Sequence, residues 1–246
     1  MNLFLAGLMG LIAAFPVNYL ADVLPWKDGR LGKALCGRCG GALGWGEYLR
    51  WWKPCPHCGK VRWRHGIVLV SLTVLSALLW IYPGKWGFWA MWVLLVYAML
   101  VAVIDAEHRL ILHVVSATGA LLLGGLGIWR HGLEATLLGG AAGASIMLLL
   151  FLLGNGYAYL KARRANQPPP TEPALGFGDV ALSTDLGLLL GWPGILAGLT
   201  FAILVAGAFS LLFLLYALLR WHRLRTDAYI PYAPFLLLGA LLAIYV

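Results

Sequence analysis

Two aspartates lie at the ends of long apolar runs, where a charged side chain is costly. Asp105 in VAVIDAEHRL closes one apolar run, and Asp179 in GFGDVAL opens another. A charged side chain at the centre of a bilayer costs about 2.5–3.5 kcal/mol or more, so such a residue is a candidate functional group by default. Two such residues at matching depth predict a paired site.

Paired carboxylates have a characteristic chemistry. Two carboxyl groups that share one site cannot both ionise easily, so one of them keeps a proton. Such a pair can hold a water molecule, with one member as general base and the other as general acid, as in aspartic proteases. Gly176 and Gly178 precede Asp179 and would let the backbone approach a substrate closely. The alternative is that each acid sits separately at a helix end, Asp179 near a positive N-terminus and Asp105 in headgroup water.

The composition places the chain in a membrane. It is 61% hydrophobic and 11% charged, with a mean hydropathy of +0.83, and would expose too much apolar surface in water. We predict an all-α, polytopic membrane helical bundle of about eight transmembrane helices. The expected spans are 2–20, 67–83, 86–104, 111–129, 133–160, 180–192, 194–219 and 232–246. The expected domains are a first transmembrane helix (1–21), a cytoplasmic tetracysteine loop (22–66) and a membrane-embedded protease core (67–246).

The Lys and Arg residues set the expected orientation. With the N-terminus outside, all of the 18 Lys and Arg residues except Lys85 and Arg130 lie inside, as the positive-inside rule requires. A re-entrant hairpin at 180–192 would move the arginines of RWHRLR outside, so eight spans fit better. The +8 charge is then a topology signal rather than a nucleic-acid footprint, and no nucleic-acid partner is expected. Both aspartates fall at the cytoplasmic face.

The cysteines form two C-x-x-C pairs with 15 residues between them, a spacing typical of zinc sites. The pairs are Cys36 with Cys39 and Cys55 with Cys58. Four thiolates close a tetrahedral site, so we predict structural Zn²⁺ with no open position for catalysis. Gly40 and Gly59 follow the pairs and are expected to have positive φ. Two disulfides are the alternative, disfavoured in a reducing cytoplasm. His57 could replace a cysteine as a ligand, but four thiolates suffice, so we expect it to be a surface histidine.

Together these motifs resemble those of the type IV prepilin peptidases, membrane aspartic proteases of pilus assembly and type II secretion. The family's S-F-L-N-V-V-I-Y-R-L-P element is similar to AAFPVNYLADVLP, and its cysteine loop corresponds to 36–58. Its F-I-D-x-x-H-x-x-L-P-D block resembles VIDAEHRLILH, which carries one catalytic aspartate onto Asp105. Its G-x-G-D-x-K-L block resembles GFGDVAL, which carries the other onto Asp179. A closing P-F-G-P-F-L-A-L-G-A element is similar to PYAPFLLLGA at 231–240.

The resemblance implies cleavage of the leader of a type IV prepilin or related pseudopilin in the bacterial cytoplasmic (inner) membrane. Many members also methylate the new N-terminus, so S-adenosylmethionine is an expected cofactor if the chain is bifunctional. No glycine-rich nucleotide motif after a strand supports this independently. Three residues depart from the family pattern and concern substrate contacts near the aspartates. They are Leu112, His113 and Ala181, in place of Pro, Asp and Lys.

Other classes of protein would need different features. A zinc-knuckle membrane scaffold would need the cysteines but neither aspartate, and a proton-coupled transporter should show broken helices and a midplane site. A presenilin-type protease shares the G-x-G-D sequence but not the cysteine loop. Asp185 would project about 120° from Asp179 on a helix, so a polar contact is expected for it rather than a place in the pair. Gly139, Gly140 and Gly143 are expected to permit close helix packing.

Overall fold

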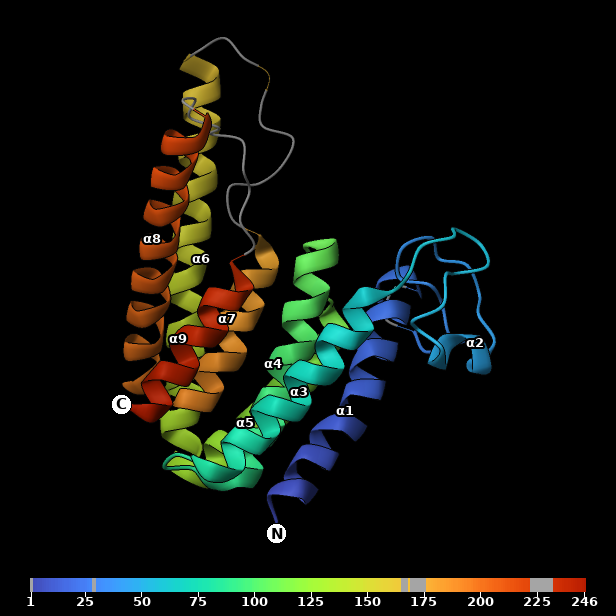
Figure 1. Cartoon of the computed structure of the whole chain (residues 1–246). Helices are drawn as coiled ribbons and strands as arrows, with labels where there is room; N and C mark the ends of the chain where they lie inside the picture. The colour runs from blue at the N-terminus through green and yellow to red at the C-terminus, as the bar shows by residue number, and fades with distance from the viewer. Residues whose placement is uncertain (1, 28–29, 165–167, 169–175, 222–231) are drawn as a thin grey trace. The chain divides into compact units, whose positions relative to one another are not determined.

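The computed structural model describes residues 2–27, 30–164, 168, 176–221 and 232–246. The chain forms two compact units, unit 1 (Met1–Val115) and unit 2 (Ser116–Val246), and Figure 1 shows the helices of each. Among the described residues the regular structure is helical, apart from one isolated bridge between Leu35 and Ala42. The predicted all-α fold is therefore confirmed.

Unit 1 is built on three long helices that contact one another. They are α1 (Leu3–Val23), α3 (Trp63–Ile81) and α4 (Gly87–His108). Ala14 and Val17 of α1 pack against Val68 and Leu72 of α3 in a buried cluster. Small residues allow this close approach, because a Cβ added at Gly10 would lie 2.2 Å from the Leu72 carbonyl oxygen.

The segment between α1 and α3 folds over the ends of these helices. It begins with the short helix η1 (Pro25–Lys27) and contains α2 (Trp45–Leu49). We call residues 30–62 the cysteine loop. Its own small core contains Ala34, Leu43 and Tyr48 together with two of the cysteines.

The helices of unit 2 pack around a short central helix. The helices are α5 (His113–His131), which begins just before the unit boundary, α6 (Leu133–Arg164), α7 (Phe177–Leu190), α8 (Gly194–Trp221) and α9 (Ala233–Tyr245). The central α7 contacts α6, α8 and α9, and Ser116 of α5 donates a 3.1 Å hydrogen bond to Asp185 of α7. Asp185 is thus buried with a polar partner, as expected. Most of α7 is buried, so this helix needs no polar face toward water.

Glycines bring α6 and α7 together, as the sequence predicts. A Cβ added at Gly139 would lie 2.4 Å from the Gly187 carbonyl oxygen, and one added at Gly143 would lie 2.4 Å from that of Ser183. The Ser183 hydroxyl donates a 3.1 Å hydrogen bond to the Gly143 carbonyl oxygen. The backbones therefore meet where neither helix has a bulky side chain.

Among the described residues, five helices are long and apolar enough to cross a membrane. These spans are Leu3–Lys27, Trp63–Ile81, Gly87–His108, Leu133–Arg164 and Gly194–Leu219. The remaining expected spans coincide with α5, α7 and α9, which are helical but are not among the five. α7 and α9 have 14 and 13 residues, or about 20 Å at about 1.5 Å per residue, against a hydrocarbon core of about 30 Å.

The helices indicate a multi-pass membrane protein. The count of eight spans, the orientation and the three-part division at 21 and 66 stay predictions. Arg223 and Arg225, which contribute to the expected orientation, lie outside the described residues.

The α6–α7 contact predicts opposite effects for two alanine substitutions in α6. Gly143→Ala should destabilise the protein by about 1–3 kcal/mol, because its Cβ would overlap a backbone oxygen. Gly156→Ala should be neutral or slightly stabilising, since its Cβ meets nothing within 4 Å and alanine favours the helix. Thermal unfolding in detergent measures both, and equal midpoints for the two variants would contradict the packing.

Candidate functional site

The four cysteines converge on one point in unit 1. Their sulfur atoms all lie within 4.8 Å of one another, and the sulfurs of Cys36 and Cys58 are 4.0 Å apart. Tetrahedral zinc with Zn–S bonds of about 2.3 Å places its sulfurs about 3.8 Å apart, whereas a disulfide needs about 2.05 Å. The donor set and its spacing therefore fit one metal ion such as zinc.

The two cysteine pairs have the same backbone geometry. The Cys36 N–H donates to the Gly41 carbonyl at 2.9 Å, and the Cys55 N–H donates to the Lys60 carbonyl at 3.0 Å. Gly40 and Gly59 both have φ of +67°, as predicted. These turns match metal-binding knuckles, in which the chain bends sharply around a sulfur atom.

His57 contacts the backbone rather than the sulfur cluster. Its Nε2 lies 3.0 Å from the Ala42 carbonyl oxygen, and the group of possible metal ligands consists of the four cysteines. The four cysteines therefore provide a complete set of four metal ligands without His57.

The loop gives the thiols different acidities. Burial raises the pKa of Cys36 to about 12, although backbone N–H groups of Arg38 and Cys39 act in the opposite direction. Burial also acts to raise the pKa of Cys55, but N–H groups of Cys58 and His57 outweigh it and lower the pKa to about 7. Hydrogen bonds to the thiolate favour the charged form, so Cys55 is the thiol best prepared to receive a cation.

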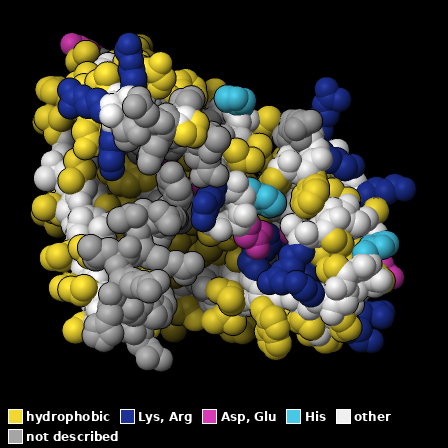
Figure 2. Space-filling model, turned by 90° about the horizontal axis from the view of Figure 1, so that it is seen from above, with side chains coloured by type: hydrophobic (Ala, Val, Ile, Leu, Met, Phe, Trp, Pro, Cys, Tyr) yellow, Lys and Arg dark blue, Asp and Glu magenta, His cyan; other side chains and the backbone are white. Residues whose placement is uncertain are grey.

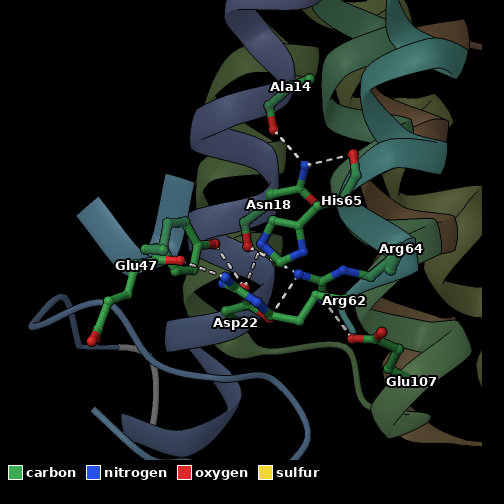
Figure 3. Close-up of polar contacts among 9 residues, drawn as sticks. Ala14, Asn18, Asp22, Glu47, Arg62, Arg64, His65 and Glu107 are labelled. Carbon is green, nitrogen blue, oxygen red and sulfur yellow. Dashed lines mark hydrogen bonds and ion pairs between the residues drawn. The ribbon is translucent and has the colours of Figure 1, made fainter. Parts of the chain in front are cut away.

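A buried carboxylate that the sequence analysis missed joins this loop to the helices. Asp22, near the end of α1, has a side chain only 1% exposed. The Tyr48 hydroxyl donates to its Oδ2 at 2.7 Å, and Arg64 Nη2 lies 2.6 Å from its Oδ1 (Figure 3). His65 Nε2 lies 3.1 Å from Oδ2. Tyr48 and Arg64 thus satisfy a carboxylate that would otherwise be costly to bury, and His65 lies beside it.

The same contacts continue to the end of α4. Arg64 Nη1 lies 2.5 Å from Glu107 Oε2, and Glu107 follows Asp105 by two positions. On the other side, a Cβ added at Gly37, inside the first knuckle, would lie 2.2 Å from Asp22 Oδ1. Burial, and then the charge of Asp22, raise the pKa of Tyr48, so its hydroxyl stays protonated and donates.

We call these residues the Asp22 network: Asp22, Tyr48, Arg64, His65 and Glu107. It connects the cysteine loop to α1, α3 and α4. Two features of the sequence hint at this network. Asp22 is an acid near the end of an apolar run, and Arg64 is a cation at the start of the next one. In the sequence alone, Arg64 is one of the charges that predict the topology.

Asp105 lies in the last turns of α4 and is 7% exposed. Its carbonyl oxygen accepts a 2.8 Å hydrogen bond from the N–H of Arg109, which has φ of +53° in the left-handed region. The left-handed conformation of Arg109 ends the helix at His108. The predicted position of Asp105 at the end of a membrane helix is therefore confirmed.

Asp179 lies in the first turn of α7 and is 8% exposed. Its N–H donates to the Gly176 carbonyl at 3.2 Å, and the ring of the neighbouring Phe177 packs edge-on against Phe151 of α6. Tyr232, just before α9, lies within range of the Asp179 charge. Tyr232 lies in the closing motif, but nothing in the sequence indicated that it would be near this acid.

The two aspartates belong to different units, Asp105 to unit 1 and Asp179 to unit 2. Each occupies a helix end with less than a tenth of its surface exposed.

One protein-family model matches part of the chain. The family model described as the type IV leader peptidase family matches residues 92–211. Residues 92–211 belong to the type IV leader peptidase family. The leader peptidase segment contains both aspartates and ends within α8, while the cysteine loop lies outside it. No curated protein and no solved structure gives a match.

The sulfur geometry predicts one zinc ion per chain. Cys→Ser at 36, 39, 55 or 58 should lower the zinc content measured by elemental analysis and expose residues 30–62 to proteolysis. His57→Ala is the control and should keep its zinc. Full zinc occupancy in the serine variants would contradict the site.

The lowered pKa of Cys55 adds a pH dependence to zinc uptake. A thiol with a pKa of about 7 is ionised above that pH and protonated below it. Zinc uptake by metal-free protein should therefore weaken as the pH falls through about 7. Equal uptake on both sides of this pH would show that Cys55 does not receive the metal first.

The Asp22 network predicts unequal effects for its two acids. Asp22→Ala should destabilise unit 1 by about 3–5 kcal/mol, because it leaves buried partners without their shared acceptor. Glu107→Ala should cost about 0–1 kcal/mol, because the Glu107 side chain is 34% exposed. Chemical unfolding and limited proteolysis of the cysteine loop measure the difference, and equal losses would show that Asp22 is not the central residue.

Proposed function

We propose that this chain is an aspartic endopeptidase that removes the leader peptide of type IV prepilins or related pseudopilins. Asp105 and Asp179 would be its catalytic pair. Membership of residues 92–211 in the leader peptidase family supports the peptidase activity. The observation that carries the catalytic assignment is that this segment holds an aspartate, less than a tenth exposed, at each of two helix ends.

Helix lengths support a common depth in the bilayer for these acids. Asp105 lies about 27 Å along α4 from Gly87, at about 1.5 Å per residue. Phe177, two residues before Asp179, packs against Phe151, which lies about 27 Å along α6 from Leu133. Because the hydrocarbon core is about 30 Å thick, helices that start at one membrane surface would bring both acids near the other.

In the proposed mechanism the carboxyl pair holds one proton and one water molecule. The ionised carboxylate takes a proton from water as the water oxygen bonds to the peptide carbonyl carbon. The protonated carboxyl group gives its proton to the carbonyl oxygen, which leaves a neutral tetrahedral intermediate with two hydroxyl groups. The intermediate collapses as the leaving nitrogen takes the proton that came from water, and one hydroxyl returns its proton to the second carboxylate. The C–N bond breaks, and the pair returns to its starting charge.

The expected substrate fits this location. A prepilin places its apolar helix in the bilayer and its short basic leader in water, so its scissile bond lies near the membrane surface. With the N-terminus outside, this is the cytoplasmic face of the bacterial inner membrane. Tyr232 lies within range of the Asp179 charge and is a candidate for contacting the substrate or the bound water.

The metal would have a structural role in this enzyme. The cysteine loop lies outside the leader peptidase segment, and four thiolates would fill the coordination sphere of zinc. In that role the loop would support the end of α4 through Arg64 and Glu107. No step of peptide hydrolysis passes through the metal.

Methylation of the new N-terminus with S-adenosylmethionine is a second candidate activity, and it rests on the family resemblance alone. The same mass spectrum that detects loss of the leader would detect a methyl group gained when S-adenosylmethionine is supplied. A zinc-knuckle scaffold would show neither change. A proton-coupled transporter would leave prepilin intact and would instead move solute across vesicles.

Substitution of the aspartates tests the peptidase. Asp105→Asn and Asp179→Asn should each reduce cleavage of detergent-solubilised prepilins below detection, because each removes one member of a proton-sharing pair. Asp185→Asn is the matched control, a buried acid on α7 whose amide oxygen can still accept from Ser116. It should retain most of the activity. Cleavage by either Asp105 or Asp179 variant at the wild-type rate would exclude the mechanism.

A further inference from the structure

A small polar pocket lies in unit 1 between the cysteine loop and the ends of three long helices. It has a volume of about 40 Å³, room for more than one water molecule because a single water needs about 10–15 Å³. Its lining includes the acids Asp22 and Glu107 and the cations Arg38, Arg62 and Arg64, with His65 beside them. Figure 2 shows Lys and Arg side chains gathered around acidic side chains over this part of unit 1.

The acids of the pocket already have cationic partners. Both Asp22 and Glu107 contact Arg64, at 2.6 Å and 2.5 Å. Asp22 also accepts from Tyr48 and lies beside His65. The charge of Arg64 is therefore shared between two carboxylates, and neither of them lies in an ion pair with Arg62.

Arg62 is a buried cation whose donors are only partly used. It is 6% exposed, its Nη2 donates to the Glu47 carbonyl at 2.8 Å, and its guanidinium lies 5.1 Å from the centre of the Tyr48 ring. Its Nε and Nη1 have no hydrogen-bond partner among the described residues. Burying charged donors without acceptors is costly, so this geometry favours an anionic ligand.

The surroundings favour an anion over a neutral ligand. Arg62 directly precedes α3, whose first N–H groups and positive end attract negative charge. Arg38 adds an exposed cation at the same pocket. A guanidinium offers paired donors in one plane, an arrangement that matches the oxygens of a phosphate group.

We propose that this pocket binds a phosphate group through Arg62 and Arg38. The pocket lies where α1 and α4 end and α3 begins, and these helices are predicted spans, so it lies at the level of lipid headgroups. The neighbouring Trp63 is 69% exposed, as is common for aromatic residues at a membrane surface. Basic pockets between membrane helices bind phospholipid headgroups, and a free phosphate offers the same oxygens.

The test measures phosphate binding by the full-length protein in detergent. Native mass spectrometry would follow titration with phosphatidylglycerol, with phosphatidylcholine and with inorganic phosphate alone. The wild type should retain phosphatidylglycerol or inorganic phosphate, and Arg62→Gln should weaken that retention at least about tenfold, as expected for loss of a charged hydrogen-bonding partner. Retention of the lipid alone identifies a headgroup, and competition by inorganic phosphate identifies a free anion.

Two further variants separate loss of binding from loss of folding. Arg50→Gln removes an exposed arginine from the same loop outside the pocket and should bind as the wild type does. Arg38→Gln changes an exposed side chain of the pocket and should weaken binding about threefold with unchanged zinc content, even if Arg62→Gln disturbs the loop. No retention of any phosphate by the wild type, or equal retention by Arg38→Gln, Arg50→Gln and the wild type, would overturn the proposal.

Discussion

The buried carboxylate of Asp22 is the contact on which the organisation of unit 1 depends. A carboxylate with 1% of its side chain exposed is stable only if donors replace the water it has lost. Those donors come from Tyr48 in the cysteine loop and from Arg64 at the start of α3. Gly37 can lie against the same carboxylate only because it has no side chain. One charge thus holds the cysteine loop against α1 and α3, and through Arg64 and Glu107 against α4, which carries Asp105.

Unit 2 positions its aspartate by packing instead of by ion pairing. The glycine contacts between α6 and α7 bring two backbones together, and α8 and α9 cover the rest of α7. A helix that packs against three others does not have to span the hydrocarbon core by itself, since protein covers most of its surface. This explains how α7 can be only 14 residues long and still hold Asp179 at the depth of Phe151 on α6.

The features predictable from sequence are those encoded by nearby residues. A C-x-x-C pair and the following glycine form one turn, so the knuckles and their positive φ could be predicted. An aspartate at the edge of an apolar run marks a helix end, so the positions of Asp105 and Asp179 could also be predicted. Asp22 and Arg64 are separated by 42 positions, and no local pattern indicates that they meet. The same holds for Tyr232 and Asp179, which α8 separates in the chain.

The distribution of arginines shows how one residue type can have two physical roles. Counted as charges, the arginines near the start of α3 contribute to the orientation that the positive-inside rule predicts. Arg64 is also shared between two carboxylates, and Arg62 is buried with unused donors, so neither behaves as a solvated surface charge. Burial costs a guanidinium much of its hydration. Two largely buried arginines at the start of one helix therefore need acceptors there, and among the described residues Nε and Nη1 of Arg62 have none.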